Sequence, residues 1–437
     1  MFENNPDSPK DTQTQTPQIT WVPYTLKSED ELRFEIDKEA KIKLADGTAE
    51  YFGTELALNR EYTLNNVKGA IFSWKGCKIE VTDNVKAYIS NGTPMLSYAN
   101  IHSIMDQHRM SILSQKNQQG PRVLIAGPTD VGKSTLAKIL MGYSARLGYN
   151  PAFIDLDPGQ GSITLPGALC ASLIDRPVDI EEGLSNTVPF VQYYGHTSLD
   201  INPTLFKAQI QSLGISVDKR MEQSDNARVS GMIVNTCGWI EGLGYELLRE
   251  SINLLRINII VVIDNEKLYS DLSREFSSGG GNNSSSGMKV MKLPKSGGVY
   301  LRSALFRKQT RMQRIREYFY GIQGDLCPHI TIVDFKDVCI FRTGGGPPAP
   351  STALPIGSTS VIDPLALQEI QPSPEMLHSV LAISYAKNSQ SLLRSNVAGF
   401  LYVSDINMET KKISFLAPCP GDLPSKFLLM GTLKWLE

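Results

Sequence analysis

Short runs of alternating apolar and polar residues fill the first part of the chain, from Glu31 to about Tyr98. The runs are LRFEID, AEYFGTELAL, EYTLNN, AIFSWKG and KIEVT, and Gly, Asn and Asp residues separate them. Alternation places neighbouring side chains on opposite faces of a strand, and close spacing between turn residues is typical of antiparallel hairpins. The pattern predicts a small β domain over residues 21–100, a sandwich or a barrel, and we favour the sandwich.

A different spacing follows in residues 101–119, IHSIMDQHRMSILSQKNQQ. Apolar residues stand at positions 101, 104, 105, 110, 112 and 113, which is closer to the period of a helix than to that of a strand. We therefore expect a linker helix over residues 101–120.

Unbroken aliphatic runs mark the middle of the chain, residues 121–325. VLIAG, AFIDLD, VSGMIVNTCG and INIIVVID are each short enough for one buried strand, and STLAKILMGYSARLG has a helical pattern. Strands that are apolar on both faces and alternate with helices are typical of a parallel sheet covered on both sides. The predicted class of this region is α/β.

The last part, residues 326–437, mixes short strands with Pro and Gly turns. The strands are AISYA, AGFLYVSDI, ISFLAP and LLMGTLKWL, and they predict a small β-rich domain. Three polar segments are expected not to pack: a disordered tail at 1–20, a flexible insertion at 277–287 (SSGGGNNSSSG) and a loop at 344–354 (GGGPPAPSTAL).

Composition narrows the class of protein. The chain has 437 residues, of which 41% are hydrophobic and 20% charged, so it can build real cores, and wholesale disorder is excluded. The net charge is −2, whereas proteins that coat nucleic acid without specificity are usually basic overall. Any contact with nucleic acid must therefore come from a local patch.

Six cysteines are scattered without a C-x-x-C pair, which argues against a zinc ribbon and a disulfide scaffold. The first twenty residues lack the apolar core of a signal peptide, and the longest aliphatic stretch, residues 257–263, has only the length of a strand. We expect an intracellular protein with reduced thiols, no zinc site and no membrane segment.

Residues 127–134 read GPTDVGKS and fit the phosphate-loop pattern G-x-x-x-x-G-K-[ST], with a buried strand before it and a helix after it. Its glycines let backbone N–H groups point at phosphate oxygens, and the helix N-terminus adds partial positive charge. Lys133 is expected to reach the β- and γ-phosphates, and the Ser134 hydroxyl to bind Mg²⁺. The full set of expected nucleotide contacts here is Gly127, Thr129, Asp130, Val131, Gly132, Lys133, Ser134 and Thr135.

Elimination favours a kinase among phosphate-loop proteins. The Asn-Lys-x-Asp motif that reads guanine is missing, and Val234-Asn235-Thr236 stands where motor ATPases carry an acidic pair. A kinase for hydroxyl groups needs a carboxylate at a strand end and cations on a lid.

The sequence offers both groups. Asp155 and Asp157 close the strand AFIDLD, and alternation along a strand points both the same way, so that both could enter the site; one of them could instead only cap the following turn. Arg307, Arg311 and Arg314 form one stripe of a predicted helix, which could also be a plain solvated face.

Several longer blocks resemble one family. They are GPTDVGKST, LDPGQGSITLPG, VNTCGW, LPKSGGV, RIREYFYG and LPSKFLLM. Together they resemble the eukaryotic Clp family of polynucleotide 5′-hydroxyl kinases, represented by a subunit of the pre-mRNA cleavage and polyadenylation machinery (cleavage factor IA in fungi). The resemblance runs from about Glu31 to the C-terminus.

The resemblance implies a central phosphate-loop kinase domain between two β domains, ATP with Mg²⁺, an RNA 5′-hydroxyl acceptor, other subunits of the cleavage complex as partners, and a nuclear location. It implies that Asp157 activates the acceptor and that Trp239 stacks on the terminal base. The further implied contacts are the lid arginines Arg302, Arg307 and Arg311, the substrate contacts Gln160 and Thr197, and Glu31 and Lys68 on the base side of the nucleotide. By their local sequence alone, Glu31 and Lys68 would be taken for exposed strand charges.

Two alternatives stay open beside the kinase. In one, bound ATP only holds domains together in a catalytically silent scaffold subunit of the same complex. In the other, the protein is a small-molecule nucleoside kinase, although such an enzyme would not need flanking β domains of this size. Because loop, carboxylate and arginines are all present, with Pro158 as a minor variation, we favour a competent enzyme.

Overall fold

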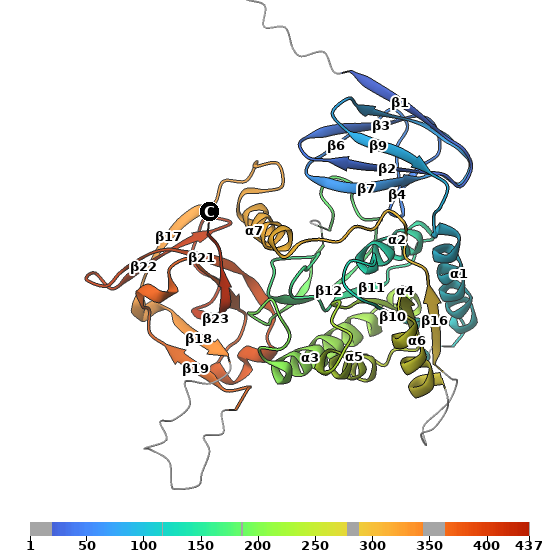
Figure 1. Cartoon of the computed structure of the whole chain (residues 1–437). Helices are drawn as coiled ribbons and strands as arrows, with labels where there is room; N and C mark the ends of the chain where they lie inside the picture. Colours follow the sequence, from blue (N-terminus) through green and yellow to red (C-terminus); the bar gives the residue numbers. More distant parts are fainter. Residues whose placement is uncertain (1–19, 116, 185–186, 278–287, 344–362, 437) are drawn as a thin grey trace, which may run out of the picture. The chain divides into compact units, whose positions relative to one another are not determined.

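The computed structural model describes residues 20–115, 117–184, 187–277, 288–343 and 363–436 (Figure 1). The chain divides into two compact units. One comprises the chain up to Tyr51 and Glu55–Asn91, and the other comprises Phe52–Thr54 and the chain from Gly92 onward. The predicted tail (but for Thr20), the insertion at 278–287 and the loop at 344–354 lie outside the described residues.

The N-terminal unit is a sandwich of two sheets whose paired strands run antiparallel. Between the sheets lie fully buried aliphatic residues, among them Leu32, Ile42 and Ile79. The strands are β1(Trp21–Leu26), β8(Cys77–Thr82), β3(Ala40–Gly47) and β6(Glu61–Leu64) in one sheet, and β5(Thr54–Glu55), β4(Glu50–Tyr51), β7(Val67–Phe72), β2(Glu31–Ile36) and β9(Lys86–Ser90) in the other. The predicted sandwich is confirmed.

Helix α1 spans Met95–Ile112, so the bounds expected from the sequence were wrong at both ends. Its buried stripe begins earlier, with Met95 and Tyr98, and continues through Ile101 and Met105 to Ile112. After Ile112 the next side chain, Leu113, is exposed and polar residues follow, so the buried stripe stops and the helix ends there.

The second unit contains a seven-stranded sheet with the phosphate-loop strand β10(Arg122–Ala126) near its middle. The order is β13-β12-β11-β14-β10-β15-β16. Strands β11(Ala152–Asp155), β14(Met232–Asn235), β15(Ile259–Ile263) and β16(Lys289–Leu293) run parallel to β10, whereas β12(Ala168–Leu173) and β13(Phe190–Tyr193) form an antiparallel edge. The predicted parallel sheet is confirmed, and the antiparallel edge is an addition.

Helices cover both faces of this sheet, as the unbroken aliphatic strands predict (Figure 1). One large core joins strand residues such as Leu124 and Val234 to Phe206 and Leu213 of α3 and Leu247 of α5. Helices α1 and α2 pack together, and α2 also contacts β10 and β14. The helices are α2(Lys133–Arg146), α3(Pro203–Glu222), α4(Asp225–Ser230), α5(Leu243–Leu254) and α6(Glu266–Leu272), the last followed by a π-helical turn, Ser273–Ser277.

The C-terminal part of this unit is built on a second seven-stranded sheet. Helix α7(Ala304–Tyr320) packs against it through Ile315 and Phe319, which share a core with Phe400 and Trp435. The order is β17(His329–Asp334), β22(Lys412–Ala417), β21(Val397–Asn407), β20(Ser379–Ser384), β23(Phe427–Lys434), β18(Cys339–Thr343) and β19(Leu367–Ile370). The β-rich C-terminal domain is confirmed.

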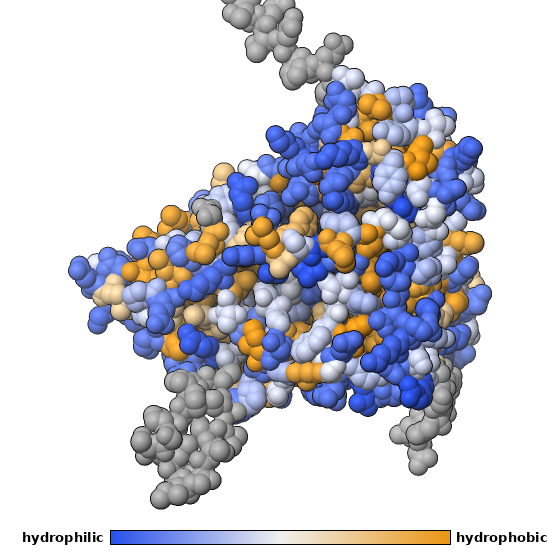
Figure 2. Space-filling view, viewed as in Figure 1, coloured by the Kyte–Doolittle hydropathy of each residue, from blue (hydrophilic) through white to orange (hydrophobic). Residues whose placement is uncertain are grey.

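The surface mixes polar side chains with small apolar patches, several of them over the C-terminal strands (Figure 2). Strand β17 lies at the edge of its sheet and exposes Ile330 and Ile332. None of the described helices has the length and apolar character of a membrane span.

Candidate functional site

The phosphate loop turns between β10 and the start of α2. Gly127 and Gly132 adopt positive φ angles of 151° and 94°, and a Cβ on Gly127 would lie 2.7 Å from the carbonyl oxygen of Ile263. Only glycine fits these two positions without strain. The loop then enters α2 at Lys133, so its backbone N–H groups gather at a helix N-terminus.

Lys133 is buried and reaches back over the loop, where its Nζ donates to the carbonyl oxygens of Gly127 at 3.0 Å and Pro128 at 2.6 Å. Burial lowers the pKa of the ammonium, while the charge of Asp157 opposes that shift. Ser134 is exposed and Thr135 half-buried in the first turn of α2. A cation over the loop and an exposed hydroxyl beside it fit a triphosphate with its metal ion.

Asp157 lies just beyond the end of β11, in a turn that its own side chain stabilises. Its Oδ1 accepts hydrogen bonds from the backbone N–H groups of Gly159 at 2.9 Å and Gln160 at 3.2 Å. Burial first, and then the charge of Asp155, raise the pKa of Asp157 to about 6, while Lys133 lowers it. A carboxylate with such a pKa can accept a proton near neutral pH.

Asp155 does not share the role of Asp157, although the sequence allowed both to enter the site. Its Oδ2 accepts from the Ser162 backbone N–H at 2.8 Å and from the Ser162 hydroxyl at 2.6 Å. Its Oδ1 accepts from the Asn235 side chain at 3.0 Å and from the Asp157 N–H at 3.2 Å. The strand ends at Asp155, so alternation no longer relates the two carboxylates, and Asp155 instead closes the loop that carries Asp157.

The segment VNTCGW runs from the end of β14 along the phosphate loop. A Cβ on Gly238 would lie 2.4 Å from Oγ1 of Thr129, so the two backbones are in close contact. Trp239 is 37% exposed and packs one side of its ring against Gly244, which excludes a core role. Burial, then Asp157, raise the pKa of Cys237 to about 11, so this thiol stays protonated.

The three arginines expected on a lid lie at or near the start of α7, with Arg302 just before the helix and Arg307 and Arg311 within it. The backbone N–H of Arg302 donates to Oδ2 of Asp130 at 2.9 Å, and its guanidinium donates to Oε1 of Gln160 at 3.0 Å. Nη2 of Arg307 donates to the same Asp130 oxygen at 2.6 Å. Burial, then Arg307, lower the pKa of Arg311, and the charge of Asp157 opposes them. The structure therefore brings the three arginines to the loop and to Asp157.

Two further residues adjoin this site. A Cβ on Gly159 would lie 2.9 Å from the Thr197 carbonyl oxygen, which places Thr197 beside the turn of Asp157. Lys138 of α2, which the sequence did not single out, has a pKa lowered to about 8 by burial, then by Arg314 and Arg302. No motif covers Lys138, and only the fold places it near α7.

Glu31 and Lys68 belong to the N-terminal sandwich. Glu31 is buried and pairs with Arg33, so it is not the exposed strand charge that its local sequence indicated. Lys68 is exposed and pairs with Glu35 at 2.5 Å. The two residues are on neighbouring strands, β2 and β7, but not at paired positions.

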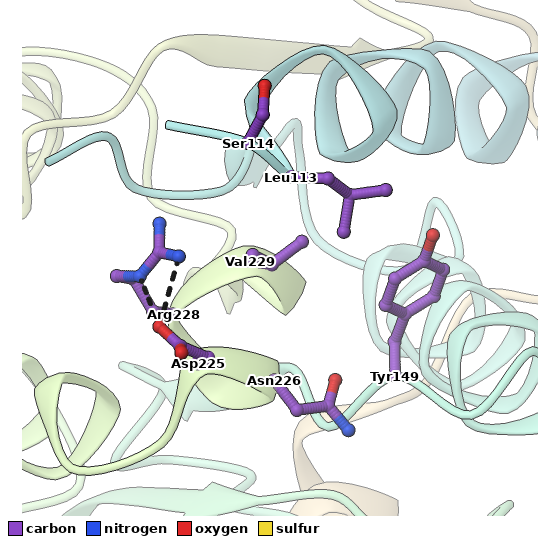
Figure 3. Close-up of a pocket in the computed structure, with 7 residues that line it drawn as sticks. All are labelled: Leu113, Ser114, Tyr149, Asp225, Asn226, Arg228 and Val229. Carbon is purple, nitrogen blue, oxygen red and sulfur yellow. Dashed lines mark hydrogen bonds and ion pairs between the residues drawn. The ribbon is translucent and has the colours of Figure 1, made fainter. Parts of the chain in front are cut away.

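A pocket of about 410 Å³ lies near the amino ends of the central strands, opposite the ends that carry the phosphate loop (Figure 3). Tyr149 and Val229 in its wall precede β11 and β14, whereas Asp157 and Cys237 follow those strands. The pocket is therefore separate from the phosphate loop. Within the ranges that the structure describes, no cluster of three or more His, Cys, Asp and Glu side chains could hold a metal ion.

Three family models match the chain. They are described as "N-terminal beta-sandwich domain of polyadenylation factor" (residues 25–112), "mRNA cleavage and polyadenylation factor CLP1 P-loop" (127–321) and "Pre-mRNA cleavage complex II protein Clp1" (326–437). Together they cover the sandwich, the phosphate-loop region and the C-terminal sheet.

Similar proteins extend over nearly the whole chain. The "Protein CLP1 homolog" of Dictyostelium discoideum is 56% identical over 94% of this chain and 89% of its own length. The human "Polyribonucleotide 5′-hydroxyl-kinase Clp1" is 38% identical over 95% and 96%. A solved structure of a Clp1p–Pcf11p complex matches with a TM-score of 0.82 at 26% identity, covering 96% of this chain and 99% of the other. The phosphate loop, the two flanking β structures and these similarities show that the chain belongs to the Clp1 family of mRNA cleavage and polyadenylation factors.

Proposed function

We propose that this protein transfers the γ-phosphate of ATP to the 5′-hydroxyl of RNA, as a subunit of the nuclear machinery that cleaves and polyadenylates pre-mRNA. The observation that carries the proposal is Asp157, a carboxylate with a raised pKa whose neighbours include Lys133 of the phosphate loop and Arg311 of the lid. The human relative is named as a polyribonucleotide 5′-hydroxyl kinase, which supports the same reaction.

The loop residues bind the triphosphate. The backbone N–H groups of Gly127 and of residues 129–135 hold the phosphate oxygens, and Lys133 exchanges its carbonyl partners for the β- and γ-phosphates. Mg²⁺, bound through the Ser134 hydroxyl, would neutralise charge on the phosphate oxygens. The lid arginines Arg302, Arg307 and Arg311 complete the positive surroundings of the transferred group.

Asp157 is the general base for the RNA acceptor. Its carboxylate takes the proton of the RNA 5′-hydroxyl while the hydroxyl oxygen forms a bond to the γ-phosphorus. The bond from that phosphorus to the β,γ-bridging oxygen breaks, and ADP leaves. The exposed Trp239 provides a stacking surface for the terminal base, with Gln160 and Thr197 beside the acceptor. Glu31 and Lys68 would contact the nucleotide's base side.

The assignment to a cleavage complex rests on the family and on a solved relative. That relative was solved as a Clp1p–Pcf11p complex, and the matching families are named for pre-mRNA cleavage and polyadenylation. We infer that this chain also binds other subunits of such a complex, in the nucleus.

One contact favours the second candidate, an ATP-bound scaffold without turnover. Arg307 pairs with the structural carboxylate of Asp130, which is the kind of partner that a purely structural arginine would have. In that case ATP would only stabilise the fold, by an amount set by its concentration relative to its dissociation constant.

Transfer of labelled γ-phosphate from ATP to an oligoribonucleotide tests the proposal. A 5′-hydroxyl oligomer should be labelled, and the same oligomer with a 5′-phosphate should not. If the purified protein retains ATP but labels neither oligomer, the scaffold is the correct function.

A further inference from the structure

Helix α7 is anchored at one end only. Ile315 and Phe319 in its C-terminal half are fully buried in the core of the C-terminal sheet. In its first turns Ala304, Leu305 and Lys308 are exposed, and Leu305 has 65% of its surface open to solvent. Hydrophobic packing therefore fixes the far half of the helix, and its first half needs polar contacts to stay over the phosphate loop.

Asp130 supplies two of these contacts. A single oxygen, Oδ2, accepts from the backbone N–H of Arg302 at 2.9 Å and from Nη2 of Arg307 at 2.6 Å. The first bond holds the chain just before α7, and the second holds the helix itself. The Asp130 side chain is only 4% exposed and that of Arg307 is 29% exposed, so the ion pair is partly shielded from water and is screened less than a fully exposed pair.

The backbone at Asp130 is unusual in the same place. Its φ angle is +58°, in the left-handed region that costs about 1–3 kcal/mol in most residues other than glycine. Strain of this kind persists where surrounding contacts hold it, and the side chain of Asp130 is held by Arg302 and by Arg307 of α7. A carboxylate in a loop that binds phosphate also repels the negatively charged phosphate groups. Phosphate binding therefore does not explain why this loop contains Asp130.

We propose that Asp130 is a latch that holds the first half of α7 over the phosphate loop and thereby positions Arg307 for phosphoryl transfer. This role rests on the proposed kinase function. Arg307 presents a planar fork of donors, and Asp130 uses one of them. Its Nε is buried and, within the described residues, has no hydrogen-bond partner. With Nη2 held, the other donors keep one orientation in which they can bind a phosphoryl oxygen.

A double-mutant cycle in single-turnover transfer to a 5′-hydroxyl RNA tests the latch. Asp130→Ala should slow transfer by about 10- to 100-fold, the size expected when a catalytic group loses its position. Asp130→Asn keeps an accepting oxygen and tolerates the positive φ, so it should recover part of the rate. If Asp130 acts through Arg307, the double variant with Arg307→Ala should be within about twofold of Arg307→Ala alone.

The control is Glu317→Gln, which removes the partner of Arg314 at 3.2 Å on the same helix and leaves the phosphate loop untouched. It should transfer at the wild-type rate. Fully additive losses in the cycle, or an unchanged Asp130→Ala rate in an active wild type, would overturn the latch but leave the kinase standing.

Hydrogen exchange gives a readout that does not need activity. Amides of Ala304–Arg311 should exchange at least several-fold faster in Asp130→Ala than in wild type, while those around Phe319 should not change. A wild type without transfer would refute the kinase, and unchanged exchange at the start of α7 would then refute the latch separately.

Discussion

At the scale of single residues, burial and neighbouring charges set the pKa of each group in the site and thereby which group can exchange a proton. Lys133 and Asp157 shift one another's pKa within one buried cluster, and both also act on the pKa of Cys237. Asp157 has a raised pKa because burial and Asp155 both oppose its charge, whereas Cys237 is held protonated. The carboxylate, not the thiol, is the group that can exchange a proton at physiological pH.

Replacement of Lys133 by Ala tests the phosphate loop. The loss of a buried charge that contacts phosphate costs about 2–5 kcal/mol, so ATP affinity should fall by about 30-fold or more, and transfer should be lost. Nucleotide content of the purified variant and calorimetric titration with ATP measure the effect. Wild-type ATP retention would contradict the assignment of this loop.

The raised pKa of Asp157 predicts the pH dependence of transfer. A base works only when ionised, so kcat/KM should decline by about tenfold per unit as the pH falls below about 6. Asp157→Asn keeps the size of the side chain and removes the base; transfer should fall by about 10²- to 10⁴-fold while ATP still binds. An equal loss of ATP binding in this variant would indicate a structural or metal-supporting role instead.

The candidate site is formed by turns that follow the carboxyl ends of the parallel central strands. The turns after β10, β11 and β14 and the start of α7 bring the phosphate loop, Asp157, Trp239 and the lid together. Parallel strands place their carboxyl ends at one edge, which is where α/β proteins bind ligands. The 410 Å³ pocket lies near the amino ends of these strands and is not part of the candidate site (Figure 3).

Replacement of Arg307 by Ala tests whether the arginine at the start of α7 assists phosphoryl transfer. Arginine is most useful when charge spreads over the transferred phosphoryl group, so transfer should fall on the order of 10³-fold while ATP occupancy stays nearly intact. Single-turnover transfer and nucleotide content on the same preparation measure the two effects. No transfer by the wild type, together with release of a partner subunit by Arg307→Ala, would instead favour the scaffold.

Within the larger unit, the central and C-terminal sheets meet at two glycines. A Cβ on Gly431 of β23 would lie 2.0 Å from the carbonyl oxygen of Gly195, and the Thr432 N–H donates to that same oxygen at 2.8 Å. His196 and Thr432 add a side-chain hydrogen bond of 3.0 Å. The two backbones are so close that no side chain fits between them.

Gly431→Ala should therefore destabilise the protein. Backbone must move to admit the methyl group, and overpacking of this kind costs about 1–3 kcal/mol. Chemical denaturation of the two variants measures it, with Gly161→Ala as the control, since a Cβ there finds only ordinary contacts at 3.7 Å. Equal stability of both variants would show that the junction is looser than the structure indicates.

The local pattern of the chain determined its elements and its phosphate loop. Alternation indicated the sandwich, aliphatic runs indicated the parallel sheet, and residues 127–134 indicated nucleotide binding, because each of these depends on neighbours in sequence. The bounds of α1 were missed because burial of Met95 depends on what the helix packs against. The sequence left open whether Asp155 and Asp157 both enter the site or one only caps the following turn, and it could not assign their contacts because the strand ends at Asp155.

Only the tertiary structure decided which distant residues meet. Asp130 and Arg307 are 177 positions apart and share a hydrogen bond, and Asp155 and Asn235 are 80 apart. Periodicity carries no information on such pairs, since it records only which face of an element is buried. Long-range contacts follow from the order of strands in the sheet and the packing of α7, and these in turn fix the burial that raises the pKa of Asp157.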